Sequence, residues 1–146
     1  MLLQKIVIAL SVMFVCTLIH ALFMMSANQV LKKRLANIGT VPRPFYRTVL
    51  IWQVIIWMFL AICIEGSIWA LVYLADPQIS VLPDTQTAFY FSMVTFTSLG
   101  YGDIVLTGPM RVLSAVQAAN GLIIFGWTTA LIFYYIQKIL GSDESS

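Results

Sequence analysis

The chain is organised around one stretch of seven residues, Thr97-Ser98-Leu99-Gly100-Tyr101-Gly102-Asp103. A short apolar segment with helix potential precedes this stretch, and a long apolar segment follows it. Glycine adopts positive φ freely, so a Gly-x-Gly strip can turn successive carbonyl groups in one direction. Inside a membrane, exposed backbone of this kind is tolerated only where it is buried in protein or lines a watery path.

Composition indicates a membrane protein with a single domain. Of the 146 residues, 60% are hydrophobic and only 10% are charged, whereas a soluble domain carries about 25% charged residues. The apolar composition predicts membrane lipid around the chain, and because the net charge is only +2, we expect no nucleic acid partner. Cys16 and Cys63 lie in apolar stretches, and we interpret them as lipid-facing or core thiols rather than a disulfide.

The stretch resembles the selectivity filter of potassium channels, whose family form is Thr-Val-Gly-Tyr-Gly-Asp. The resemblance covers about residues 48–140 and is to the bacterial type of pore domain, with two helices and a re-entrant filter loop. It implies that potassium ions bind to the carbonyl groups of four residues and to one hydroxyl group. The four residues are Ser98, Leu99, Gly100 and Tyr101, the hydroxyl is that of Ser98, and Gly102 completes the filter.

Residues 1–31 are predicted to form an N-terminal transmembrane helix, which lies outside the two-helix pattern. Only Lys5 and His20 interrupt its apolar run, and about 20 apolar residues suffice to span a bilayer. A signal peptide is the competing interpretation, with Lys5 in its basic region and residues 6–18 as its apolar region. The apolar run continues to Met25, beyond what a signal peptide needs, which favours the helix. It also lacks the arginine ladder of a voltage sensor.

Residues 32–47 are predicted to form a basic cytoplasmic loop. The glycine at 39 and the prolines at 42 and 44 break helices. Six of the eight basic residues would then lie on the inner side: Lys32, Lys33, Arg34, Arg43, Arg47 and Lys138. The positive-inside tendency therefore predicts a multi-pass protein of the cell membrane with its N-terminus outside and its C-terminus in the cytoplasm. A patch that attracts anionic lipid is the alternative interpretation of these charges.

The outer helix is predicted over residues 48–76, and Glu65 is its anomaly. An ionisable side chain at membrane depth is costly and usually faces protein or water. His20 on the first segment is one candidate partner. The alternative is that Glu65 lies near the outer interface and bonds to backbone or water.

A pore helix is predicted over residues 85–97, with Asp84 or Thr85 as its N-cap. The segment is too short to span a bilayer. The resemblance implies that Tyr90 hydrogen-bonds Asp103 and that Thr97 helps to support the filter, which spans residues 98–103. Some members of the family carry a carboxylate behind the filter where this chain has Val94, so we expect support from elsewhere.

The inner helix is predicted over residues 110–140, and residues 141–146 form a polar tail that we expect to be disordered. Gly121 falls at the position of the family's hinge glycine, and close helix packing on a small residue is the alternative. Thr129, Phe133 and Gln137 recur every four residues and share one face. We expect that face to point at the pore, with Thr129 at the cavity and Phe133 and Gln137 at the gate.

The sequence thus predicts an all-α membrane protein with three transmembrane helices, a re-entrant pore helix and a filter. A pore lined on all sides needs several copies of the filter, and the resemblance implies a homotetramer. The expected function is passive, selective potassium conduction, with potassium as the permeant ion and no cofactor. A weakly selective cation channel is one alternative, because Ser98 replaces threonine and no carboxylate stands at Val94. A non-conducting membrane subunit of a partner channel or transporter is another. An enzyme has the least support, since the chain has one histidine and no metal-ligand spacing.

Overall fold

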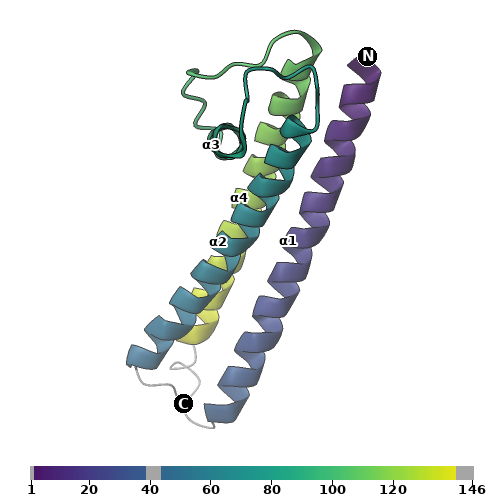
Figure 1. The fold of residues 1–146 in the computed structure, drawn as a ribbon. Coiled ribbons are helices and arrows are strands. Elements are labelled where there is room, and N and C mark those ends of the chain that lie inside the picture. Colours follow the sequence, from purple (N-terminus) through teal and green to yellow (C-terminus); the bar gives the residue numbers. More distant parts are fainter. Residues whose placement is uncertain (1, 39–43, 141–146) are drawn as a thin grey trace.

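The computed structural model describes residues 2–38 and 44–140 (Figure 1). Its elements are α1 (Leu2–Ile38), α2 (Pro44–Leu74), α3 (Thr85–Phe96), a 3-10 turn η1 (Gly108–Met110) and α4 (Arg111–Leu140). Helices α1, α2 and α4 run along one another as a bundle. The short helix α3 packs against α2 and α4 near the end of the bundle that holds the N-terminus.

Within the described ranges, three helices are long and apolar enough to cross a membrane: α1, α2 and α4. The 12 residues of α3 are too few to span a bilayer. The described residues contain no strand. The prediction of an all-α membrane protein is therefore confirmed.

The predicted basic loop over residues 32–47 is wrong at both ends. Helix α1 continues to Ile38, and α2 already begins at Pro44. Lysine, arginine, leucine and alanine are good helix formers, so α1 continues through the basic residues to Ile38, immediately before Gly39. Helix α2 can begin at Pro44 because proline is tolerated in a first helical turn. Residues 39–43, which include Arg43, and the polar tail 141–146 lie outside the described residues. The other predicted helix boundaries lie within four residues of the observed ones, and those at residues 85 and 140 coincide with them.

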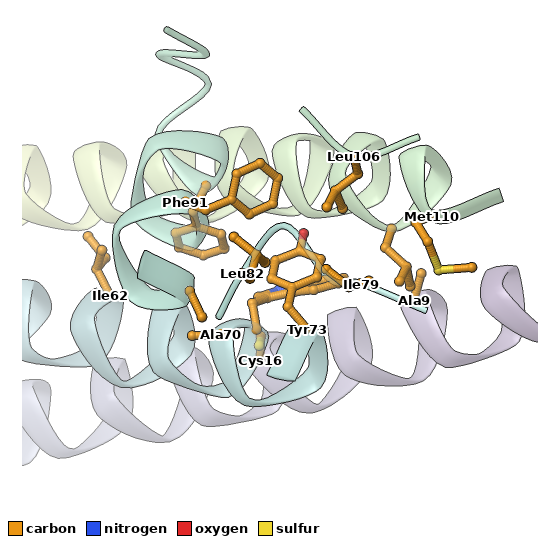
Figure 2. Packing of buried hydrophobic residues seen from close by; sticks show 14 of the residues in the cluster. Ala9, Cys16, Ile62, Ala70, Tyr73, Ile79, Leu82, Phe91, Leu106 and Met110 are labelled. Atoms are coloured by element: carbon orange, nitrogen blue, oxygen red, sulfur yellow. The ribbon is translucent and has the colours of Figure 1, made fainter. Parts of the chain in front are cut away.

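The main core lies beside α3, at the end of the bundle where the N-terminus lies (Figure 2). Side chains from all the helices and from the connecting loops meet there, and those labelled in the figure are Ala9, Cys16, Ile62, Ala70, Tyr73, Ile79, Leu82, Phe91, Leu106 and Met110. A second cluster joins the three long helices towards the other end, through residues such as Leu31, Leu50 and Ile139. The two clusters together hold α1, α2 and α4 along most of their length.

His20 connects α1 to both of the other long helices. Its Nδ1 atom lies 3.0 Å from Oε1 of Glu65 on α2, and its Nε2 atom lies 3.0 Å from Oγ1 of Thr128 on α4. The imidazole ring also stacks on Trp127, with 6.1 Å between ring centroids. His20 and Glu65 are both fully buried. Of the two interpretations of Glu65, the structure therefore shows the pair with His20.

Removing the imidazole would leave the buried Glu65 carboxyl group without its hydrogen-bond partner, whereas removing the carboxyl group would leave the imidazole its bond to Thr128 and its stacking on Trp127. Breaking a buried pair costs about 3–5 kcal/mol, while replacing both partners by apolar side chains is often neutral.

We therefore expect His20→Leu to lower the free energy of unfolding by about 3 kcal/mol and Glu65→Leu to lower it by less. The double variant His20→Leu/Glu65→Leu should recover most of the loss. The measurement is thermal unfolding of the purified protein in detergent, followed by the loss of the folded peak in size-exclusion chromatography. Two single losses that simply add in the double variant would contradict the coupling.

Candidate functional site

Helix α3 begins with a side-chain cap. The Asp84 side chain accepts hydrogen bonds from the backbone N–H of Thr87 at 2.8 Å and from its hydroxyl group at 3.0 Å. The backbone bond, followed by the hydroxyl bond, lowers the pKa of the Asp84 carboxyl group. The carboxylate thus stays charged at the positive end of the helix. Of the two predicted N-caps, Asp84 is the one observed.

The same helix ends in a Schellman motif that leads directly into residues 98–103, here called the strip. The N–H of Leu99 donates to the carbonyl of Val94 at 3.0 Å, and the N–H of Ser98 donates to the carbonyl of Thr95 at 2.9 Å. The motif requires a left-handed residue, usually glycine, and here Ser98 takes that role with φ of 58°. A left-handed non-glycine residue costs roughly 1–2 kcal/mol, so the start of the strip is strained.

Thr97, which was predicted to support the filter, is the C-cap residue of α3. Its hydroxyl group donates to the carbonyls of Met93 and Val94, at 2.9 and 3.2 Å. The side chain therefore bonds to the last turn of the helix, immediately before the strip.

The φ angles of the strip alternate in sign. Positive φ occurs at Ser98, at Gly100 (54°) and at Gly102 (80°), but not at Leu99 or Tyr101 between them. Peptide units that alternate between right- and left-handed residues direct their polar groups to a common side, as they do in backbone nests. The alternating sign of φ in the strip is the pattern that such a row of polar groups requires.

The far end of the strip is tied back to α3. The Tyr90 hydroxyl donates to Oδ2 of Asp103 at 2.8 Å, so the predicted hydrogen bond is confirmed. This bond, together with smaller contributions from burial and charge, raises the pKa of the Tyr90 phenol. Tyr90 therefore remains a donor, and both ends of the strip are anchored to the same short helix.

The side chains of the strip have little cover from their own chain. Leu99 is 56% exposed and Tyr101 is 67% exposed. Next to them, a hollow of about 650 Å³ lies between the strip and the start of α4. Apolar side chains of α4, including Val112, Ala115 and Ala118, line its wall. This is an apolar concave surface of the kind that another chain can cover.

A chain of buried hydrogen bonds holds α3 from behind. The Tyr73 hydroxyl on α2 donates to Oε1 of Gln117 on α4 at 2.5 Å. The amide nitrogen of Gln117 donates to the Ser92 hydroxyl at 2.7 Å and to the Ser92 carbonyl at 3.1 Å. The Ser92 hydroxyl in turn donates to the carbonyl of Gly66 at 2.6 Å. All three side chains are buried, so Gln117 joins α3 to both neighbouring helices.

Sequence reasoning did not find this network. The signals in the sequence were two amides, Gln117 and Asn120, in the largely apolar segment of α4. They did not identify the partners, which come from segments far apart in the chain. Val94 supplies no carboxylate behind the strip. The hydrogen bonds from Gln117 to Ser92 support α3 instead.

Gly121 marks the closest approach between α4 and α3. A Cβ at this position would overlap the carbonyl group of Phe96 and lie 2.8 Å from its carbon atom. The packing interpretation of Gly121 is therefore what the structure shows. Its predicted role as a hinge stays a prediction.

Thr129, Phe133 and Gln137 lie on an exposed face of α4. Thr128 and Tyr135, which neighbour them in sequence, are buried among the other helices. The three residues predicted to face a pore thus share a surface that their own chain leaves uncovered. The Thr129 hydroxyl bonds within its helix, to the carbonyl of Phe125 at 2.8 Å.

A family model described as an ion channel matches residues 47–138. The match includes the strip, α3 and most of α2 and α4, and it leaves α1 outside. No curated protein and no solved structure matches the chain.

Two glycines of α4 allow a matched test of the contact with α3. Gly121→Ala should lower the free energy of unfolding by about 1–3 kcal/mol, because the added methyl group overpacks against backbone that cannot move aside. A Cβ added at Gly126 would have no atom within 4 Å, so Gly126→Ala should be neutral or stabilise by up to about 1 kcal/mol. Thermal unfolding in detergent measures both. Equal effects of the two substitutions would contradict the close approach.

Proposed function

Because residues 47–138 place the chain in the ion channel family, we propose that it conducts potassium ions selectively and passively across the cell membrane. The observation that carries this proposal is the alternating φ of the strip, which can aim the carbonyl groups of Ser98, Leu99, Gly100 and Tyr101 at one axis. Rings of backbone carbonyls replace the hydration shell of potassium in selective filters. The Ser98 hydroxyl would add one more oxygen at the inner end.

We propose a homotetramer as the conducting form. One chain supplies one strip, a pore lined on all sides needs several, and the resemblance implies four. The exposed Leu99 and Tyr101 side chains and the apolar hollow beside them support the proposal, since neighbouring chains would cover both. In that assembly the exposed face of α4 would line the path below the strip, with Thr129 at the cavity and Phe133 and Gln137 at the gate.

Weak selectivity among cations is the second candidate. Ser98 lacks the methyl group of threonine, and its strained left-handed backbone gives the innermost ion site less support. Reversal potentials under bi-ionic conditions separate the two candidates, because a selective filter gives a strong preference for potassium over sodium and a weakly selective filter does not.

The proposed topology places the N-terminus outside and the C-terminus in the cytoplasm. The cations Lys32, Lys33, Arg34, Arg47 and Lys138 lie towards one end of the bundle, and Lys5 and Arg111 lie towards the other. This asymmetry supports the assignment by the positive-inside tendency.

A cysteine added ahead of Met1 should react with a membrane-impermeant thiol reagent from outside the cell. Lys32→Cys should react only from the cytoplasmic side and serves as the paired control. Both cysteines are placed in a chain whose Cys16 and Cys63 are replaced by alanine. The opposite pattern of labelling would reverse the topology.

Gly102 and Gly108 both have positive φ, 80° and 56°, and neither has an atom within 4 Å of its Cβ position. Alanine at either site therefore adds similar backbone strain, roughly 1–2 kcal/mol, but only Gly102 belongs to the strip. We expect Gly102→Ala to abolish potassium selectivity or conduction, while Gly108→Ala keeps both. The measurement is the potassium-to-sodium permeability ratio of purified protein in planar bilayers. If Gly102→Ala keeps the wild-type ratio and current, the strip does not line the conduction path.

A further inference from the structure

Helix α4 is held by different neighbours in its two halves. Before Gly121, the Gln117 amide bonds to side chains of α2 and α3, and Asn120 accepts a hydrogen bond from α2. Beyond Gly121, Oγ1 of Thr128 lies 3.0 Å from Nε2 of His20 on α1. The first half is therefore fixed beside the strip by α2 and α3, whereas the second half takes a buried polar contact from α1.

The segment between these two sets of contacts contains two glycines, Gly121 and Gly126. Glycine is one of the weakest helix formers and one of the residues at which helices kink. A Cβ added at Gly126 would have no atom within 4 Å, so open space adjoins this part of the helix. Helix α4 nevertheless runs unbroken over Arg111–Leu140. The residues that can bend thus lie between the half held by α3 and the half held by α1.

Helices α1 and α4 run in the same direction, and both continue beyond this contact (Figure 1). Leu31 and Ile139 follow His20 and Thr128 by the same number of residues, and both are buried in the second cluster. Within a bilayer, apolar contacts of this kind give little net drive for association, because lipid tails are equally apolar. The bond between His20 and Thr128 therefore adds a specific attraction between α1 and this half of α4.

The His20 ring is oriented for this bond from two other sides. Its Nδ1 atom lies 3.0 Å from Oε1 of Glu65 on α2, and its plane stacks on Trp127, the residue before Thr128. His20, Glu65 and Thr128 are all buried, so water does not compete for the contact. A contact that only one of two helix positions allows shifts the equilibrium towards that position.

We propose that α1 restrains the opening of the channel through the bond between His20 and Thr128. While the bond is made, the half of α4 beyond Gly121 stays against α1 and the helix remains unbroken. When it breaks, this half can bend away from α1 and move the proposed gate residues Phe133 and Gln137. The inference rests on the proposed function, since it concerns the gate of the same pore. Helix α1 lies outside the matched residues 47–138, so the restraint is a feature of this chain.

The test is single-channel recording of the purified protein in planar bilayers. Thr128→Val keeps the shape of the side chain and removes its hydroxyl group. We expect it to raise the open probability about threefold, the size of one hydrogen bond between membrane helices. Thr128→Ser keeps the hydroxyl group and should keep the wild-type open probability. His20→Leu should raise the open probability at least as much as Thr128→Val does.

Thr17→Val is the matched control, because it is the same substitution on α1. The Thr17 hydroxyl group donates to the carbonyl of Met13 in its own helix at 2.8 Å, so its loss should leave the open probability unchanged. Wild-type open probability in both Thr128→Val and His20→Leu would overturn the restraint. An equal rise in Thr17→Val and Thr128→Val would also overturn it, because that result means a general loosening of the bundle.

A second measurement does not need ion conduction. Leu31→Cys is placed in the chain whose Cys16 and Cys63 are replaced by alanine, and its reaction with a small uncharged thiol reagent is followed in detergent. Because Leu31 is buried in the second cluster, the reaction rate reports how often α4 leaves α1. Thr128→Val should raise this rate about threefold, and Thr17→Val should not.

The two measurements separate the restraint from the proposed function. A reaction rate that Thr128→Val leaves unchanged would overturn the restraint, whether or not the protein conducts ions. A wild type without ion current, in which Thr128→Val still raises the rate, would contradict the proposed function and confirm that α1 holds α4.

Discussion

The placement of the strip depends on one buried amide, that of Gln117. A helix of 12 residues is only marginally stable by itself, so α3 must take its position from its neighbours. Gln117 accepts from Tyr73 on α2 and donates twice to Ser92 on α3. In a setting without water, each of these groups would otherwise be left unsatisfied at a cost of about 1–3 kcal/mol. The amide therefore fixes the distance and rotation of α3 between the two long helices.

The same face of α4 carries two more contacts that bear on the strip. Asn120 accepts from the Trp69 indole at 3.2 Å, and Gly121 lets the helix approach the carbonyl of Phe96, the last residue of α3. Since the strip begins two residues after Phe96, the helix proposed to line the pore also sets where the strip starts. Movement of α4 at Gly121 would change both at once, which gives a direct physical route from α4 to the proposed ion sites of the strip.

The sequence predicted what is local or compositional. The apolar spans, the Asp84 cap and the strip follow from patterns within a few residues, and the bond between Tyr90 and Asp103 follows from the resemblance. The end of α1 was predicted too early because basic residues mark the edge of a membrane span, and helical backbone does not stop at that edge. The roles of Gln117 and Ser92 could not be predicted, since they depend on how distant helices pack. The pairing of His20 with Glu65 could not be decided for the same reason, because the sequence does not determine the depth at which each side chain lies in the bundle.

The position of α1 raises a separate physical question, because this helix lies outside the region matched by the family. Lipid tails are as apolar as leucine, so burying apolar side chains between helices gives little net drive for association within a bilayer. Polar contacts must then set the position of α1, and they are spread along it. Lys5 pairs with Asp76 near one end, His20 bonds to two helices near the middle, and Ser26 accepts from Trp57 beyond it. Contacts at three heights fix both the register and the rotation of a helix. They hold α1 in one orientation against the channel domain.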